Sequence, residues 1–328
     1  MSNERADSKT SKIWQCLGFL AGLFLLLTGL SIAVRPGEND VYNLSNYTRT
    51  LEAVRMEKPQ TIDVLFAGDS EASDGFSPLQ FWGEQGISSY NISNPAQILN
   101  DSYAILVETV KEQNVKVLVL ETSCMYLKSE IYSDDQWLAM AEKAFPIFHY
   151  HQVYRLLKPK SVSFQNIQKS ASLKGFWLKT GVRPYEGTLE YMGSKDADPL
   201  AFQSSTYPML DKLIGACREN NIKVVLVSMP APVYWNYSRH NAVQEWADEY
   251  GLEYIDFNLM NDELGMDWSQ DTTDGGNHLS FSGTVKVCSW LADYLHKTYS
   301  LPDHRGDPQY DSWQNAYEET GLYGGSES

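Results

Sequence analysis

Residues 62–70 read Ile-Asp-Val-Leu-Phe-Ala-Gly-Asp-Ser, a nearly apolar run that ends in a polar turn. A run of this length, with β-branched and aromatic residues, is typical of a strand buried on both faces. Similar short runs lie at residues 90–92, 115–120, 222–227 and 254–256. The alternation of these runs with helical stretches predicts an α/β fold with a doubly wound parallel sheet of five strands.

Apolar residues at helical spacing mark the segments between the predicted strands. The stripes lie at residues 104–110, 210–217, 243–250 and 283–299. Residues 123–204 are too long for a simple crossover, so we expect a partly helical insertion that forms a lid or docking surface. The main domain then spans residues 61–300, and the polar residues 301–328 are predicted to form a surface or disordered tail.

A long uncharged stretch, residues 13–34, stands near the amino terminus. At about 1.5 Å per residue its helix would span a hydrocarbon core of roughly 30 Å, which predicts a transmembrane anchor. A cleaved signal peptide is the alternative, because the small side chains of Ser31 and Ala33 offer a cleavage site. Residues 35–60 are then a stalk that runs into a helix near residues 51–55.

The charges around the anchor predict its orientation. Arg5, Lys9 and Lys12 precede it within residues 1–12, whereas Arg35 is soon followed by acidic residues. The positive-inside bias places this short tail in the cytoplasm and the main domain outside the cell membrane. The whole chain carries a net charge of −16, which speaks against binding nucleic acid or anionic lipid through a general positive field.

The cysteines and two of the histidines form no metal-ligand or disulfide pattern. Cys16 lies in the anchor. The other cysteines have no paired spacing and are expected to be small buried hydrophobes: Cys124, Cys217 and Cys288. His149 and His151 stand two residues apart without a third ligand, which favours packing or substrate contact. The sequence therefore predicts no metal and no cofactor.

Ser70 is the candidate nucleophile, because it follows a buried strand at the edge of the sheet where ligands bind in this fold class. Its hydroxyl needs a base, and a neutral imidazole late in the chain, that of His278, is the best candidate. An acid must then hold the tautomer of this ring. Asp274 and Asp271 both precede it in a glycine-rich loop, and either fits. The backbone N–H of Ser70 is expected to help bind an oxyanion, and Asp69 to hydrogen-bond the turn.

Two short blocks carry a resemblance to a known family: Gly-Asp-Ser at residues 68–70 and Asp-Gly-Gly-Asn-His at residues 274–278. They resemble the nucleophile and Asp-x-x-His blocks of the SGNH/GDSL hydrolase superfamily, over about residues 61–299. The resemblance implies a flavodoxin-like strand order and a Ser-His-Asp triad. The family spacing would put the acid at Gly275, so either Asp274 serves with one extra loop residue or Asp271 takes the role.

The sequence departs from the family where further oxyanion donors are expected. The glycine of the second block is not evident in residues 90–97, and Glu121-Thr122-Ser123 stands where a Gly-x-Asn-Asp block would follow the third strand. Asn94 and Gln97 are our predicted substitutes as oxyanion or substrate-binding donors. Either amide equally suits the cap of the helix that follows.

The anchor, the external domain and these departures together look like the envelope branch of the superfamily, which includes DltD-like and polysaccharide O-acetylation proteins. The resemblance implies a serine esterase or acyltransferase acting on acetyl or D-alanyl groups of a cell-envelope polysaccharide or teichoic acid. It also implies a multi-pass membrane O-acyltransferase as partner. The alternative is a non-catalytic envelope protein that holds a polymer or such a partner in the same crevice.

Overall fold

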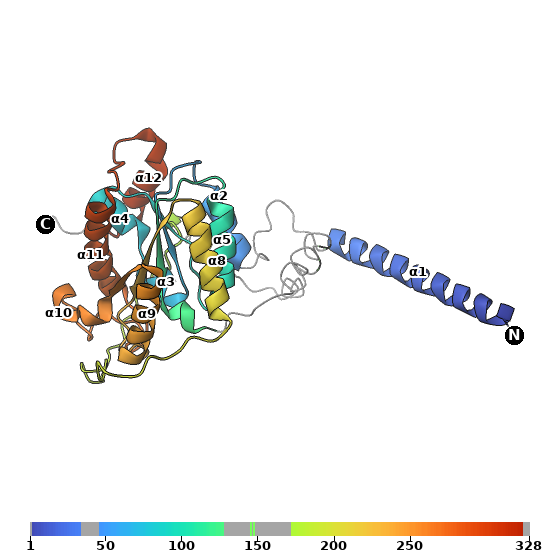
Figure 1. The fold of residues 1–328 in the computed structure, drawn as a ribbon. Coiled ribbons are helices and arrows are strands. Elements are labelled where there is room, and N and C mark those ends of the chain that lie inside the picture. Colours follow the sequence, from blue (N-terminus) through green and yellow to red (C-terminus); the bar gives the residue numbers. More distant parts are fainter. Residues whose placement is uncertain (1, 34–45, 128–144, 146, 148–171, 324–328) are drawn as a thin grey trace. The chain divides into compact units, whose positions relative to one another are not determined.

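The computed structural model describes residues 2–33, 46–127, 145, 147 and 172–323, which divide into two compact units. One unit holds the amino-terminal helix, and the other holds the sheet with its covering helices (Figure 1). His149 and His151 lie outside the described residues.

The amino-terminal helix α1 (Ser2–Ala33) contains the predicted anchor. Within it Lys12–Ile32 has a mean hydropathy of 1.9 and is long enough to cross a membrane, and it is the single such helix among the residues described. In its own unit, the Phe24 ring meets the Phe145 ring edge-on at 5.5 Å between centroids. A membrane anchor and a signal sequence share these properties, so the uncleaved anchor stays a prediction.

The second unit is built on five parallel strands in the order β2-β1-β3-β4-β5. The strands are β1 (Val64–Ala67), β2 (Ser89–Asn91), β3 (Val117–Glu121), β4 (Lys223–Ser228) and β5 (Glu253–Asp256). The predicted α/β fold is confirmed, and the order is the flavodoxin-like one that the family resemblance implied. Because all the strands are parallel, their carboxyl ends meet at one edge.

Helices cover both faces of this sheet (Figure 1). One layer contains α2 (Asn46–Arg55), α5 (Leu99–Thr109), α8 (Thr206–Glu219) and α9 (Tyr237–Tyr250). The opposite layer contains α3 (Ser70–Gly75), α4 (Pro78–Gln85) and α11 (Phe281–Tyr299), with the short α10 (Asn261–Leu264) beside it. The insertion and the carboxyl terminus add to this frame, as described below.

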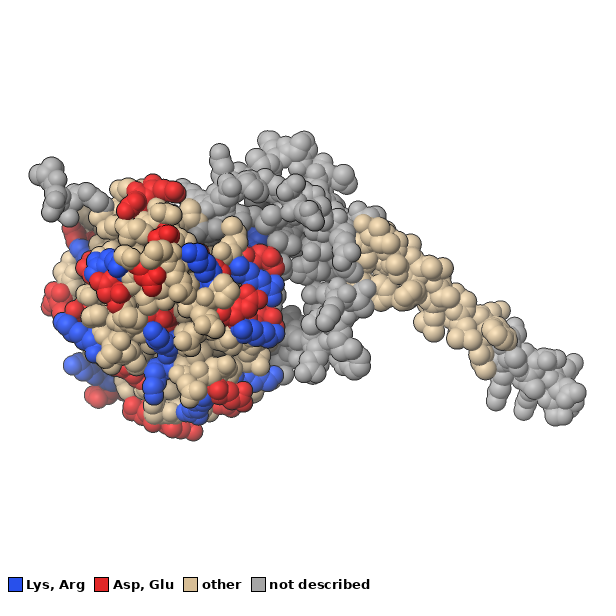
Figure 2. Space-filling model, turned by 90° about the horizontal axis from the view of Figure 1, so that it is seen from above, with Lys and Arg blue, Asp and Glu red and all other residues tan. Residues whose placement is uncertain are grey.

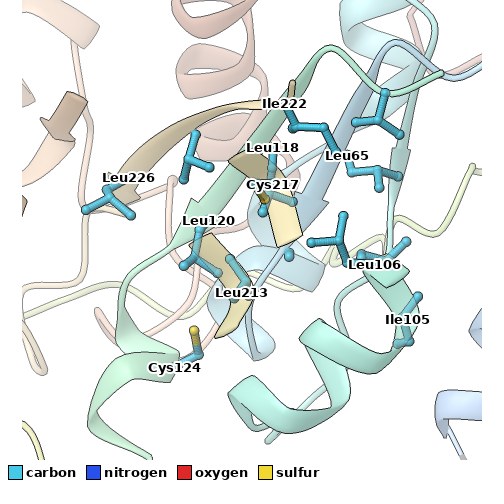
Figure 3. Close-up of a cluster of buried hydrophobic side chains, with 14 of the residues drawn as sticks. Leu65, Ile105, Leu106, Leu118, Leu120, Cys124, Leu213, Cys217, Ile222 and Leu226 are labelled. Atoms are coloured by element: carbon cyan, nitrogen blue, oxygen red, sulfur yellow. The ribbon is translucent and has the colours of Figure 1, made fainter. Parts of the chain in front are cut away.

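The alternation of strand side chains explains why two layers are needed. Leu65 and Leu118 point into the layer under α5 and α8, where Figure 3 shows them packed with Leu106 and Cys217. Their neighbours along the strands, such as Phe66, point into the layer under α11. Burial of each such side chain is worth roughly 1.5–3 kcal/mol. The prediction for the cysteines is confirmed, because the three beyond the anchor are buried and unpaired.

The surface of this unit carries both signs of charge. On the face shown in Figure 2, acidic and basic side chains are interspersed over the α/β unit. The net charge of −16 is therefore not gathered into one acidic patch on that face.

Of the predicted insertion, residues 123–204, the structure describes 123–127, 145, 147 and 172–204. The first of these segments contains the 3-10 helix η2 (Ser123–Tyr126), and residues 173–204 form turns and irregular chain, so a partly helical insertion stays a prediction. Residues 174–185, named the strap here, are held by backbone hydrogen bonds to several segments of the domain. Asn91 N donates to Lys174 O at 2.9 Å, and Phe281 N donates to Lys179 O at 2.8 Å. The backbone of the strap therefore has hydrogen-bond partners in the rest of the domain.

The carboxyl terminus differs from the predicted surface or disordered tail. Residues 301–323 fold back onto the domain through η5 (Pro308–Tyr310) and α12 (Asp311–Thr320). Trp313 is fully buried and stacks at 6.4 Å from Trp82, and its Nε1 donates to Ser89 O at 3.0 Å. This segment is polar overall, and the buried face of α12 consists of few residues, Trp313 and Ala316, so the sequence pattern does not reveal it.

The predicted stalk is also partly wrong. The expected helix near residues 51–55 is present as α2, but its Leu51 and Val54 are buried in the domain core. The domain therefore begins by residue 46, and residues 34–45 lie outside the described part of the chain.

Replacing Trp313 by Ala is expected to lower the free energy of unfolding by about 3–5 kcal/mol, because a buried indole is lost from a packed site. Chemical denaturation of the full chain measures this loss. The control Glu319→Ala, at an exposed position of the same helix, is expected to change stability by less than about 0.5 kcal/mol. A Trp313 variant as stable as the control would show that α12 does not pack on the domain.

Candidate active site

Ser70 is the first residue of α3, directly beyond the carboxyl end of β1. Gly68 makes this turn possible, because a Cβ there would come within 2.7 Å of the Ala72 Cβ and 2.8 Å of the Glu121 Cβ. Asp69 caps the helix, and its Oδ1 accepts the Glu71 N–H at 3.1 Å. The expected hydrogen-bonding role of Asp69 in the turn is confirmed. As the first helical residue, Ser70 has an N–H that no intrahelical carbonyl accepts.

The structure brings Ser70, His278 and Asp274 into one hydrogen-bonded chain. Nε2 of His278 lies 2.9 Å from the Ser70 Oγ, and Nδ1 lies 2.6 Å from the Asp274 Oδ2. An ionised carboxylate only accepts, so Nδ1 carries the proton and Nε2 is free to accept from the serine hydroxyl. Burial raises the pKa of Asp274, but hydrogen bonds from the ring and backbone of His278 outweigh it and hold that pKa below its usual value.

The loop before α11 places the acid and the base on one side of a tight turn. Thr273 N donates to His278 O at 3.0 Å, and Gly276 N donates to the Thr272 Oγ1 at 2.7 Å. Gly275 and Gly276 have φ values of 89° and 103°, a region that favours glycine. This turn accommodates one residue more than the family spacing and still brings Asp274 to the imidazole.

Asp271, the alternative acid, forms hydrogen bonds and an ion pair with residues other than His278. Its Oδ2 lies 2.6 Å from the Lys286 Nζ and accepts the Asp267 N–H at 2.7 Å, and its Oδ1 accepts from the Ser282 hydroxyl at 2.8 Å. The side chain is 1% exposed. These contacts tie the loop to α11, so the geometry favours Asp274 as the partner of His278.

Asn94 and Gln97, the predicted oxyanion donors, bond to each other and to their surroundings. The Asn94 Nδ2 donates to the Gln97 Oε1 at 2.7 Å and to the Thr50 Oγ1 at 3.0 Å. The Gln97 Nε2 donates to Ile92 O at 3.1 Å and to the Ser102 Oγ at 2.9 Å. Their N–H groups are therefore occupied by protein acceptors, and the expected oxyanion role gains no support. The contact to Ser102 instead ties Gln97 to the first turn of α5.

A group of buried carboxyls, not predicted from the sequence, surrounds the nucleophile: Asp69, Glu71, Asp74 and Glu121. Ser123 donates to the Asp69 Oδ1 at 2.7 Å. Burial raises the pKa of Glu71 and of Glu121 well above the usual value, and the neighbouring carboxylates raise both further. The signal was present in the run Asp69-Ser70-Glu71, but only the folded structure shows that these side chains turn inward.

The raised pKa values of Glu71 and Glu121 predict a contribution to stability that falls as the pH rises. The native state keeps protons on Glu71 and Glu121 that the unfolded chain releases near pH 4.3, so the stabilisation is present below that pH and lost through the higher native pKa values. The slope is at most about 1.4 kcal/mol per pH unit for each retained proton. Urea denaturation across a pH series measures it.

The matched variant Glu121→Gln is expected to flatten this slope, because it removes one of the two raised carboxyls. Glu319→Gln, at an exposed position, is expected to leave the slope as in the unsubstituted chain. A slope that is unchanged in Glu121→Gln would contradict the raised pKa of Glu121.

The strap passes along the candidate site. Trp177 N donates to Ser73 O in α3 at 2.9 Å, and Arg183 N donates to Thr272 O in the loop before His278 at 3.1 Å. Tyr185 packs so closely on Gly276 that a Cβ there would meet its ring at 2.7 Å. The strap therefore helps to hold the loop that carries the acid and base. A lid made by the rest of the insertion stays a prediction.

Comparison with known proteins gives structural neighbours only. No protein-family model matches the sequence, and no curated protein matches it significantly. A GDSL-like lipase from Bacteroides thetaiotaomicron is 11% identical with a TM-score of 0.40, over 77% of this chain and 98% of that one. A catalytic mutant of an acetylxylan esterase from Geobacillus stearothermophilus is 13% identical with a TM-score of 0.37, over 72% and 95%. The function proposed below rests on the site itself.

Proposed function

We propose that this chain is a serine esterase or acyltransferase with Ser70 as nucleophile, His278 as general base and acid, and Asp274 as the orienting acid. The observation that carries the proposal is the continuous hydrogen-bonded chain from Asp274 through His278 to the Ser70 hydroxyl, at 2.6 Å and 2.9 Å. Both distances fall within the range that proton transfer to a base requires.

The reaction proceeds in two steps. The Ser70 Oγ attacks the acyl carbonyl, its proton passes to Nε2 of His278, and the oxyanion forms beside the Ser70 N–H. Nε2 then gives that proton to the leaving alcohol as the acyl–oxygen bond breaks, which leaves an ester on Ser70. Water or an acceptor hydroxyl reverses these steps and removes the acyl group. The two outcomes are hydrolysis and transfer, and they differ in whether water is kept from the acyl-enzyme.

The proposed substrate is an O-acyl group, acetyl or D-alanyl, on a cell-envelope polysaccharide or teichoic acid. Three features support this proposal: the apolar stretch of α1 at residues 13–33, the basic residues that precede this stretch, and the resemblance of residues 90–97 and of the histidine block to the envelope branch of SGNH/GDSL proteins. In this scheme α1 is a single-pass anchor, the catalytic domain works outside the membrane, and a multi-pass membrane O-acyltransferase is the partner. Labelling from outside the cell of a cysteine introduced at exposed Glu319 tests the orientation.

Reaction of the full chain with a fluorophosphonate tests the proposed chemistry. We expect one covalent adduct, mapped by mass spectrometry to the peptide that contains Ser70. An adduct on another serine, or none, would reject the nucleophile. Product analysis with an acylated glycan, in the presence and absence of a deacylated acceptor, then separates transfer from hydrolysis.

A further inference from the structure

Glu71 follows the nucleophile along the chain and lies next to the base. Its side chain is 6% exposed, and its Oε1 is 3.7 Å from Nε2 of His278, the same nitrogen that faces the Ser70 hydroxyl. The carboxyl group therefore lies beside the nitrogen that receives the proton of the serine hydroxyl. The function proposed above assigns it no role.

One of the two carboxyl oxygens of Glu71 has no hydrogen-bond partner in the described part of the chain. Its Oε2 is buried and makes no hydrogen bond with any described residue. Buried polar atoms in folded proteins are nearly always hydrogen-bonded, so an unpartnered one next to a nucleophile indicates where a polar atom of a ligand would bond. The amides of Asn94 and Gln97, which the sequence suggested for this purpose, donate to protein acceptors.

The surroundings of Glu71 decide which kind of bond it can make. Burial raises its pKa, and so do neighbouring acids on three segments: Glu121, Asp69, Asp74 and Asp274. Two cationic or titratable groups face this cluster. Lys179 of the strap lies 3.6 Å from the Asp74 Oδ2, and His278 lies against Glu71 itself. Burial and these neighbouring acids therefore favour the protonated form of the Glu71 carboxyl, which has one O–H to donate.

We propose that the Glu71 carboxylic acid donates its O–H to the acyl carbonyl oxygen of the substrate and to the oxyanion that replaces it. This donor acts beside the Ser70 N–H and supplies a hydrogen bond that Asn94 and Gln97 do not. The proton stays on Glu71 throughout, so no step consumes or releases it. The inference rests on the proposed function, since it needs an ester attacked by Ser70.

Two variants of Glu71 show whether its side chain acts as a hydrogen-bond donor or only occupies volume in the site. Glu71→Met keeps the approximate volume and removes the donor, so kcat for an aryl acetate is expected to fall about 10²–10³-fold, as when one oxyanion donor is lost. Its melting temperature is expected to rise, because an unpartnered buried polar group has gone. Glu71→Gln keeps an N–H donor and is expected to retain kcat within about tenfold. The surface control Glu319→Gln should match the unsubstituted chain.

The pH profile gives a readout that a purely structural role would not move. In the unsubstituted chain, kcat/KM should decline on the alkaline side as Glu71 ionises and its charge repels the oxyanion. Glu71→Gln, which cannot ionise, should lack that decline. This comparison needs only the conservative variant, so it decides the question even where Glu71→Met does not fold.

Either of two results would overturn the inference: Glu71→Met within about threefold of the unsubstituted kcat, or Glu71→Gln reduced as far as Glu71→Met. The second result would indicate an ionised Glu71 that stabilises the imidazolium. Failure of the proposed function looks different, because the unsubstituted chain would then give no fluorophosphonate adduct on Ser70. An adduct on Ser70 together with an active Glu71→Met variant removes only the role of Glu71.

Discussion

Replacing Ser70 by Ala is expected to reduce kcat for an aryl acetate by at least about 10⁵-fold, because the acyl-enzyme can no longer form. His278 and Asp274 would remain in place, but they would have no hydroxyl to activate. Initial-rate kinetics on the purified full chain measure the loss. Circular dichroism and the melting temperature show that the variant is folded, as expected for the removal of one partly exposed hydroxyl.

The matched control is Ser73→Ala, three residues along the same helix. The Ser73 hydroxyl donates to the backbone oxygen of Ser70 and to the Asp74 side chain, and neither of these hydrogen bonds involves the imidazole. We expect this variant to keep kcat within about tenfold. Equal losses in both serine variants would mean that activity depends on the integrity of α3 and not on the hydroxyl at position 70.

Replacing Asp274 by Asn is expected to lower kcat by about 10³–10⁴-fold with little effect on KM. The amide can donate to Nδ1, which favours the tautomer that carries its proton on Nε2, and that nitrogen then cannot accept from Ser70. Initial-rate kinetics with the aryl acetate separate kcat from KM.

The control Asp271→Asn tests the alternative acid of the sequence analysis. Asp271 forms a buried ion pair with Lys286 at 2.6 Å, so its loss should lower the melting temperature clearly while the folded protein keeps most of its kcat. The reverse pattern, an active Asp274 variant and an inactive but stable Asp271 variant, would exchange the two roles.

The sheet was predictable because its three central strands, β1, β3 and β4, are buried on both faces and appear as apolar runs. All five strands lie within two or three residues of the predicted ones. Helix α12 was missed for the opposite reason, since its burial depends on few side chains in a polar segment, chiefly Trp313. Likewise, α2 was found as a helix, but its sequence does not reveal that Leu51 and Val54 pack on the domain.

The candidate site was predictable where chemistry needs a particular residue type. A nucleophile after a buried strand and a late histidine pointed to Ser70 and His278. The choice between Asp274 and Asp271 depends on the backbone at Gly275 and Gly276, which spacing does not specify. The hydrogen bonds of the Asn94 and Gln97 amides were not predictable, because only the folded structure shows which protein acceptors take their N–H groups.

The burial of Glu71 and its raised pKa could not be predicted from the sequence either. An acid beside a nucleophile in the sequence would ordinarily point to solvent, but α3 packs against α11, β1 and β3, and Glu71 is buried there. The neighbouring carboxyl of Glu121 comes from a segment fifty residues away along the chain. Its raised pKa is therefore a tertiary property, and so is any role that depends on it.

The most direct test of the central claim is a rapid-quench experiment in which the full chain is mixed with an activated acetate ester and the protein is analysed by mass spectrometry. The account predicts a transient species heavier by one acyl group, with the modification on Ser70. It also predicts that this species does not accumulate in His278→Ala. Ester turnover with no acylated Ser70, or equal acylation in His278→Ala, would contradict the proposed relay from Asp274 through His278 to Ser70.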